Sequence, residues 1–165
     1  MITQTGALIL LVPALPIAVW AAGNDLKRMK IPNLAVIALA TVWPLLGWLA
    51  VETWTTWFWG FALFFLTFLA GFLLYTTGTF GAGDAKYAAA MAPIFVGTPI
   101  FRLLTIILLC LIGALILHRI ARATPAIRRL TPDWESWARQ RYFPLGLTLS
   151  LILIVYLVAA IWPHA

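Results

Sequence analysis

Asp25 and Asp84 are the two acidic residues whose surroundings in the sequence suggest chemistry. Two carboxyl groups that share one water molecule cannot both ionise cheaply, so one of them keeps its proton near neutral pH. The ionised group accepts a proton from the water, which then attacks a carbonyl carbon. The protonated group hydrogen-bonds the carbonyl oxygen and later supplies a proton to the leaving nitrogen. Such a pair suits the hydrolysis of a peptide bond and needs neither a metal nor an organic cofactor.

Asp84 has a structural explanation as well as a chemical one. It follows a glycine-rich stretch and could cap a helix, with Lys86 as its counter-ion. Capping alone does not explain Gly81 and Gly83, because glycine permits unusual backbone angles and the close approach of another backbone. An ionisable group at the edge of an apolar segment is costly, which makes Asp84 a candidate functional residue.

Asp25 lies shortly before Ile31-Pro32-Asn33, a turn at which a helix restarts because proline fixes its own φ angle. Taken alone, Asp25 could simply pair with Lys27, Arg28 or Lys30 at a wet interface. The two aspartates are more informative together. Packed helices lie about 8–10 Å apart, so they can bring two such side chains to one water molecule.

The composition places these residues in a membrane protein. Hydrophobic residues make up 64% of the 165 residues and charged residues 10%, whereas a soluble domain is roughly half apolar and about a quarter charged. This excludes a soluble enzyme, a disordered tail and a secreted disulfide scaffold. The net charge of +6 could suggest nucleic acid. The basic residues lie between apolar runs, however, so we expect the lipid bilayer and no nucleic acid as a partner.

Six apolar segments fit the length of about 20 residues that a membrane-spanning helix needs. They cover roughly residues 5–22, 33–51, 55–75, 81–97, 100–118 and 144–162. They leave no room for a separate soluble domain. We therefore expect an all-α integral membrane protein with six transmembrane helices, organised as one polytopic domain over residues 1–165.

The positive charges predict the orientation. Of the eleven lysines and arginines, only Arg102 falls on the second side of the predicted spans. The cation-rich side faces the cytoplasm, so both termini should lie outside and both aspartates should lie at the cytoplasmic face. The first apolar run has cations after it but none before it. We therefore expect a retained span and not a cleaved signal peptide.

The last cytoplasmic loop contains the pattern of a helix start. Thr131 is predicted to cap the helix, and Pro132 to occupy its first position, with two acids in the first turn. Trp134 and Trp137 share a face, so this short helix should lie in the headgroup layer, anchored by its tryptophans. A docking surface for a substrate is the alternative.

The cysteine and the histidines give little support for a metal site or a nucleophile. A single cysteine, Cys110, and two histidines far apart in the chain offer no metal site and no Cys/His nucleophile. We expect His118 to be a cation at a helix end and His164 to be solvated.

Three sequence elements together resemble the type IV prepilin peptidases, the GxGD class of intramembrane-type aspartic proteases. The first is Asp25 followed by Ile31-Pro32-Asn33, and the second is Phe80-Gly81-Ala82-Gly83-Asp84-Ala85-Lys86. The third is Phe143-Pro144-Leu145-Gly146 at the start of the last span, although Leu145 stands where an aromatic residue is more usual. The similarity is greatest to the short TadV/CpaA-like branch that serves Flp-type pili, and it covers nearly the whole chain.

The resemblance implies a function and a site. Members remove the short basic leader from prepilins at the cytoplasmic membrane face, which in this chain would make Asp25 and Asp84 the catalytic pair. Substrate-binding or supporting roles would fall to Gly81, Gly83, Lys86, Ile31, Pro32 and Asn33. Longer relatives also methylate the new terminus, using an added N-terminal domain with paired CxxC motifs. We expect peptidase activity without the methylase domain, in the cell inner membrane, with a prepilin as partner and no cofactor.

Several alternatives remain open. Lys86 could hold Asp84 ionised, bind an acid on the substrate or reach the headgroups, and we favour a supporting electrostatic role. The chain could instead be an archaeal-type preflagellin peptidase. A small proton-coupled transporter subunit, with Asp25 and Asp84 as relay groups, is a candidate from another class. It predicts acids along a path through the membrane, whereas both aspartates are expected on one side. The sequence leaves the oligomeric state and the identity of the pilin open.

Overall fold

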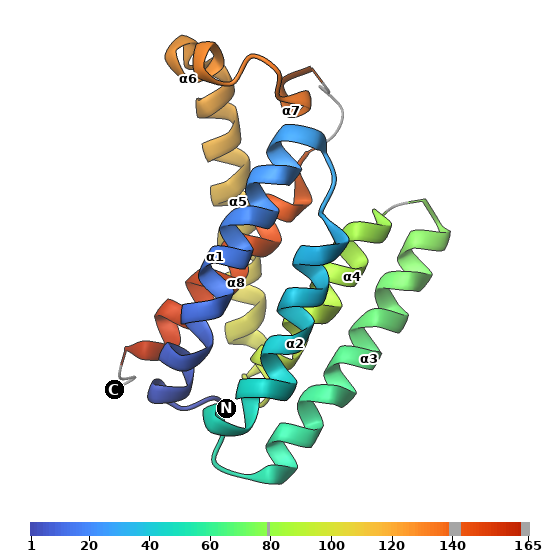
Figure 1. Cartoon of the computed structure of the whole chain (residues 1–165), viewed down its shortest axis with the longest axis vertical. Helices are drawn as coiled ribbons and strands as arrows, with labels where there is room; N and C mark the ends of the chain where they lie inside the picture. Colours follow the sequence, from blue (N-terminus) through green and yellow to red (C-terminus); the bar gives the residue numbers. More distant parts are fainter. Residues whose placement is uncertain (79, 139–142, 163–165) are drawn as a thin grey trace.

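The chain forms a bundle of helices (Figure 1). The computed structural model describes residues 1–78, 80–138 and 143–162. Its elements are α1 (Gln4–Arg28), α2 (Asn33–Ala50), α3 (Trp54–Thr76), α4 (Ala82–Met91), the 3-10 helix η1 (Ala92–Phe95), α5 (Ile100–Ala123), α6 (Pro125–Leu130), α7 (Glu135–Ala138) and α8 (Leu145–Ile161). No strand occurs in these described parts, so the all-α prediction is confirmed.

Four of the helices, α1, α2, α3 and α5, are long enough and apolar enough to cross a membrane. Helix α8 is also apolar but has 17 residues. Helix α4 has only 10 residues, and the chain continues as η1, which contains Pro93. Proline lacks an N–H group and crowds the preceding turn, so it ends a regular α-helix. The fourth predicted span is therefore a broken helix.

Helix α1 is longer than the apolar run 5–22 that predicts it. It continues to Arg28, which places Asp25 in its last turn. The helix ends at Met29, whose φ angle of 52° is left-handed and whose N–H bonds to the Asp25 carbonyl at 2.8 Å. This is an αL helix end, for which glycine is the usual residue. The helix thus stops abruptly beside Asp25.

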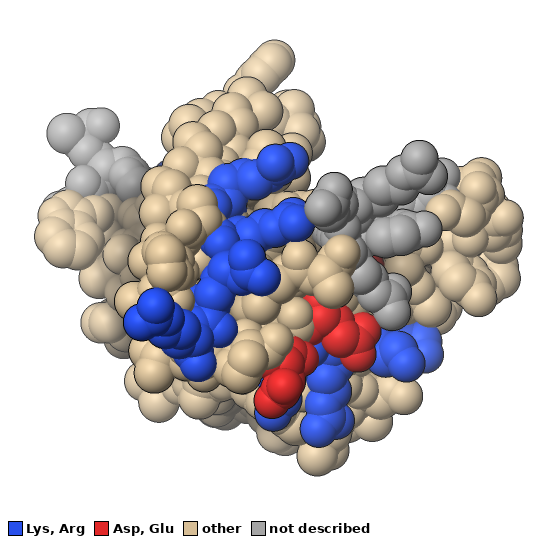
Figure 2. Space-filling view, turned by 90° about the horizontal axis from the view of Figure 1, so that it is seen from above, with Lys and Arg blue, Asp and Glu red and all other residues tan. Residues whose placement is uncertain are grey.

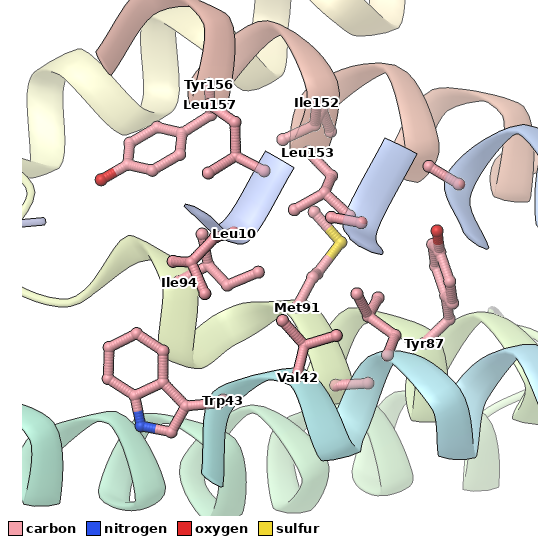
Figure 3. Close-up of a cluster of buried hydrophobic side chains, with 14 of the residues drawn as sticks. Leu10, Val42, Trp43, Tyr87, Met91, Ile94, Ile152, Leu153, Tyr156 and Leu157 are labelled. Atoms are coloured by element: carbon pink, nitrogen blue, oxygen red, sulfur yellow. The ribbon is translucent and has the colours of Figure 1, made fainter. Parts of the chain in front are cut away.

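The interior of the bundle holds large side chains from α1, α2, α4, η1 and α8 (Figure 3). Helix α1 packs along α8 and α2, and it carries four fully buried alanines, Ala7, Ala14, Ala18 and Ala21. Such small residues let two helix backbones approach closely. Trp43 is buried and donates from Nε1 to the Trp57 carbonyl at 3.1 Å, which ties α2 to α3.

The outside of the bundle is apolar, as the membrane prediction requires. Large side chains such as Phe65 and Phe72 on α3 and Leu109 on α5 are exposed. In water these side chains would form an unusually large apolar surface. The four long apolar helices and this surface indicate a multi-pass membrane protein.

One end of the bundle carries most of the charge. Helices α1, α3 and α5 end there, and α2, α4 and α8 begin there, with α6 and α7 lying above them (Figure 1). Viewed from this end, lysines and arginines gather across the surface, with acidic side chains beside them (Figure 2). The structure thus places Asp25 and Asp84 at one end of the bundle, as the topology predicts.

The predicted start of the loop helix is wrong. Helix α7 begins at Glu135, and residues 131–134 form a turn after α6, a helix that the sequence pattern did not predict. The Thr131 hydroxyl donates back to the Ile127 carbonyl at 2.7 Å. Thr131 therefore closes α6 and does not cap the next helix.

The loop tryptophans also differ from expectation. Trp137 is only 6% exposed, and its ring stacks on His118 with centroids 5.3 Å apart. Trp137 therefore packs inside the protein and is not a headgroup anchor. His118, expected as a cation at a helix end, is buried under this ring. Arg139 and Arg141, two of the cations counted for the orientation, and His164, expected to be solvated, lie outside the described residues.

Candidate active site

Asp25 and Asp84 line the same cavity, which has a volume of about 330 Å³. The cavity lies where the last turn of α1, the connection to α2 and the first turn of α4 meet. Its lining includes most of the residues singled out in the sequence, namely Ile31, Asn33, Gly81, Gly83 and Lys86. The fold thus brings together two carboxyl groups that are distant in the chain.

Asp25 is held by the beginning of α8. Its side chain is only 4% exposed, and the backbone N–H of Gly146 donates to Oδ2 at 2.7 Å. Pro144 is the N-cap of α8 and supplies no side-chain hydrogen bond to the helix end. The Asp25 carboxylate takes the place of that missing cap, and the helix end favours a negative charge. This contact fixes one acid of the pair.

Gly146 contacts the candidate site, although sequence reasoning assigned it no role. A Cβ atom at this position would lie 2.9 Å from Oδ2 of Asp25 and 2.9 Å from Cγ1 of Ile31. Only glycine leaves room for the carboxylate to reach the helix end. The motif Phe143-Pro144-Leu145-Gly146 supported the family resemblance, but its sequence gave no sign of this contact.

Asp84 caps the helix that carries it. Gly81 is the N-cap of α4, and Asp84 is the third residue of the helix. The backbone N–H of Gly81 donates to the Asp84 carboxylate, which is the reciprocal half of a capping box. A Cβ atom at Gly81 would lie 2.5 Å from Oδ2 of Asp84, so a side chain there would displace the acid. The cap positions Asp84 without removing it from the cavity.

The shared cavity couples the two acids electrostatically. Two carboxyl groups close to each other cannot both ionise cheaply, so a pair of this kind favours holding one proton between them. One group of such a pair can then accept a proton while the other donates one.

The Ile31-Pro32-Asn33 turn supports both acids. Ile31 is buried and lies against Gly146 of α8 on one side. A Cβ atom at Gly83 would lie 3.6 Å from Cβ of Ile31, so Gly83 also adjoins Ile31. Pro32 is the N-cap of α2, with a φ angle of −64° that its ring favours. The turn thus wedges one apolar side chain between the helix starts that hold the two acids.

Two lysines complete the lining of the cavity. Lys30 and Lys86 are both exposed at its edge. Lys86 also lines a second cavity of about 330 Å³ between α3 and α4, whose walls include Phe68, Phe72 and Tyr75. Lys86 therefore lies between the cavity of the two aspartates and a second cavity with aromatic walls.

Two further observations concern residues beside the pair. Met29, with its left-handed backbone, lines the cavity and was not predicted, because methionine does not signal such a turn. Among the described residues, no cluster of three or more histidine, cysteine or acidic side chains could hold a metal ion. Cys110 is buried in the core, on α5.

Comparison with known proteins gives one match. Residues 12–118, more than half of the chain, match the family model described as the type IV leader peptidase family. The matched segment includes both aspartates and the Ile31-Pro32-Asn33 turn. No curated protein and no solved structure matches the chain.

Proposed function

The chain belongs to the type IV leader peptidase family, and we propose that it is a membrane-embedded aspartic endopeptidase. In this proposal it removes the basic leader from Flp-type prepilins at the cytoplasmic face of the cell inner membrane. Asp25 and Asp84 are its catalytic pair. The family membership supports a protease, and the features of the site support the choice of these residues.

The observation that carries the proposal is the cavity shared by Asp25 and Asp84. Each acid also caps a helix, and capping alone would not require two caps from different helices to open into one cavity. Two neighbouring carboxyl groups that share one proton can activate a water molecule for attack on a carbonyl group.

The surroundings of the two acids suggest how the work is divided. Asp25 accepts a hydrogen bond from the N–H of Gly146 at the start of α8, a position that suits a negative charge, so Asp25 is the proposed base that takes a proton from water. Asp84, the second carboxyl group of the cavity, is the proposed acid. Water oxygen forms a bond to the carbonyl carbon while Asp84 hydrogen-bonds the carbonyl oxygen. The C–N bond then breaks as Asp84 gives its proton to the leaving nitrogen, and Asp25 keeps the proton that it took from water.

The placement in the membrane follows from the same proposal. The six segments predicted as spans cross the bilayer, with α4 and η1 together forming the fourth. The cation-rich end faces the cytoplasm, and the start of α1 and the end of α8 face outward. A prepilin helix would then lie along the bundle, with its scissile bond level with the two aspartates. Gly81 and Gly83 leave room there for an extended peptide.

Lys86 is proposed to support the reaction and not to perform it. Its position at the rim of the cavity allows its charge to act on Asp84 or on an acidic group of the substrate. Ile31, Pro32 and Asn33 hold the helix ends in place, which makes them positioning residues.

The proposal is tested by mixing the purified protein in detergent with a Flp-type prepilin. Mass spectrometry identifies the two products, and Asp25→Asn and Asp84→Asn are compared with the unchanged protein. Both variants should keep their helical circular dichroism and lose cleavage by about 1,000-fold or more. Glu52→Gln is the matched control, because Glu52 is an exposed acid in the turn between α2 and α3. Near-normal turnover by either aspartate variant would show that the pair is assigned wrongly.

A further inference from the structure

A second concave site lies away from the aspartates, where α5 ends and α6 and α7 follow. A cavity of about 590 Å³ is lined by Arg122, Arg128, Arg129 and Trp137, among others. An adjoining cavity of about 410 Å³ shares Arg122 and Arg128 and adds Arg119. We call these two cavities together the arginine pocket. It is distinct in its lining residues from the cavity that holds the two aspartates.

The backbone explains why these arginines meet. Arg119 and Arg122 are three residues apart near the end of α5, so they share one side of the helix. Helix α5 ends at Ala123, and Pro125 begins α6, which turns the chain so that Arg128 faces the same cavity. The arginines therefore come from two successive helices, α5 and α6, and the turn between these helices brings them to one cavity.

The charge of the pocket calls for an anion. Among the described residues that line its two cavities, none is acidic. Like charges held close together repel each other, and an anionic ligand would relieve this repulsion. The space-filling view shows the band of lysines and arginines across this end of the bundle (Figure 2). Guanidinium groups suit phosphate oxygens in particular, because they donate two parallel hydrogen bonds.

The neighbours of the arginines are apolar and exposed. Ile120 on α5 is 58% exposed, and Leu130 on α6 is 84% exposed. Side chains of this kind suit contact with acyl chains, directly beside groups that suit a phosphate. The buried ring of Trp137 forms part of the wall of the pocket.

We infer that the arginine pocket binds the phosphate-bearing headgroup of an anionic phospholipid from the cytoplasmic leaflet. Basic pockets at the cytoplasmic ends of membrane helices have the chemistry for such headgroups. The basic leader of the proposed substrate carries the same sign of charge as the pocket and is not its ligand. The proposal of an anionic ligand does not depend on the peptidase proposal, because none of the residues that line the arginine pocket lines the cavity of the two aspartates.

Lipid binding here would act on the loop next to the catalytic helix. Trp137 belongs to α7, which packs against α1, the helix that carries Asp25. A lipid held by Arg122 and Arg128 would thus steady α6 and α7 on the bundle. Its bound state should therefore be measurable as a higher melting temperature of the protein, because a ligand of the folded state stabilises it.

The test counts lipids on the purified protein by native mass spectrometry. Phosphatidylglycerol and phosphatidylcholine are added separately in neutral detergent, and inorganic phosphate is added as a competitor. Phosphatidylglycerol should bind about tenfold more tightly than phosphatidylcholine. Arg122→Gln with Arg128→Gln should abolish this preference and the accompanying rise in melting temperature. Arg129 is exposed, so Arg129→Gln should fold, and it should weaken the preference for phosphatidylglycerol. This variant replaces the double variant if the double variant does not fold.

The matched control is Lys27→Gln with Arg28→Gln, which removes two exposed cations at the end of α1, outside the pocket lining. This control should keep the preference for phosphatidylglycerol. Equal losses in the control and the arginine variant would overturn the proposal, because binding would then follow general surface charge. Absence of any preference, or displacement of the lipid by equimolar inorganic phosphate, would overturn the assignment of a lipid headgroup.

Discussion

The carboxylate of Asp25 accepts a 2.7 Å hydrogen bond from the backbone N–H of Gly146, at the first turn of α8. The contact joins the end of the first long helix to the start of the last one. It places a negative side chain at the positive end of a helix, where an anion is stabilised. The geometry of the first acid thus depends on a residue without a side chain, far away in the sequence.

Replacing Gly146 by alanine should therefore disable the site while leaving the fold intact. The added Cβ atom would meet Oδ2 of Asp25 and Cγ1 of Ile31 at 2.9 Å, so the carboxylate must move. A displacement of a catalytic group by about 1 Å can lower the rate about 100-fold. The measurement is prepilin cleavage in detergent, with circular dichroism to check folding. The control is Gly113→Ala on α5, where a Cβ atom meets nothing within 4 Å. Wild-type cleavage by Gly146→Ala would contradict the role given to this contact.

Gly81→Ala should act on the second acid in the same way. Its Cβ atom would lie 2.5 Å from Oδ2 of Asp84, which breaks the cap at the start of α4. We expect a fall in cleavage of about tenfold or more, together with a loss of about 1 kcal/mol from the lost cap. Thermal unfolding and cleavage are both measured. Gly23→Ala in α1 provides the comparison, because a Cβ atom there has open space. If both glycine variants behave alike, the crowding at Gly81 has no functional role.

The pH dependence of cleavage should be bell-shaped. Two carboxyl groups that line one cavity cannot both ionise cheaply, so the pair holds one proton over an intermediate pH range and loses it at higher pH. Because the proposed acid must be protonated, the rate should fall about tenfold per pH unit on the alkaline side. Towards low pH the rate should also fall, once the remaining carboxylate takes up a proton. A rate that stays constant from pH 6 to pH 9 would rule out this assignment of the acid.

The convergence of the two aspartates could be predicted from the sequence. The apolar runs predict the order of the helices along the chain, and successive helices run in opposite directions, which brings Asp25 and Asp84 to the same end of the bundle. The helical period and the length of an apolar run depend only on a local stretch of sequence, so both can be predicted without knowledge of the tertiary contacts.

The contacts that hold the acids could not be predicted. Gly146 acts through a backbone N–H, which every residue except proline has, so its sequence carries no special signal. Met29 adopts a left-handed backbone that the sequence would suggest only if it were glycine or asparagine. The prediction of the loop helix was wrong for a related reason. A threonine hydroxyl can accept a hydrogen bond from a following N–H group or donate one to a preceding carbonyl, and Thr131 donates to the carbonyl of Ile127.

The most direct test of the account is whether residues 25 and 84 face each other in the protein in its membrane. Asp25→Cys and Asp84→Cys are combined in a Cys110→Ala background and treated with a short bifunctional thiol reagent in native vesicles. Mass spectrometry should find an internal cross-link between the two positions. The control pair, Asp25→Cys with Glu52→Cys, should give none, because Glu52 lies in the turn between α2 and α3, at the other end of the bundle. A cross-link in the control pair, or none in the test pair while both cysteines react singly, would contradict the shared site.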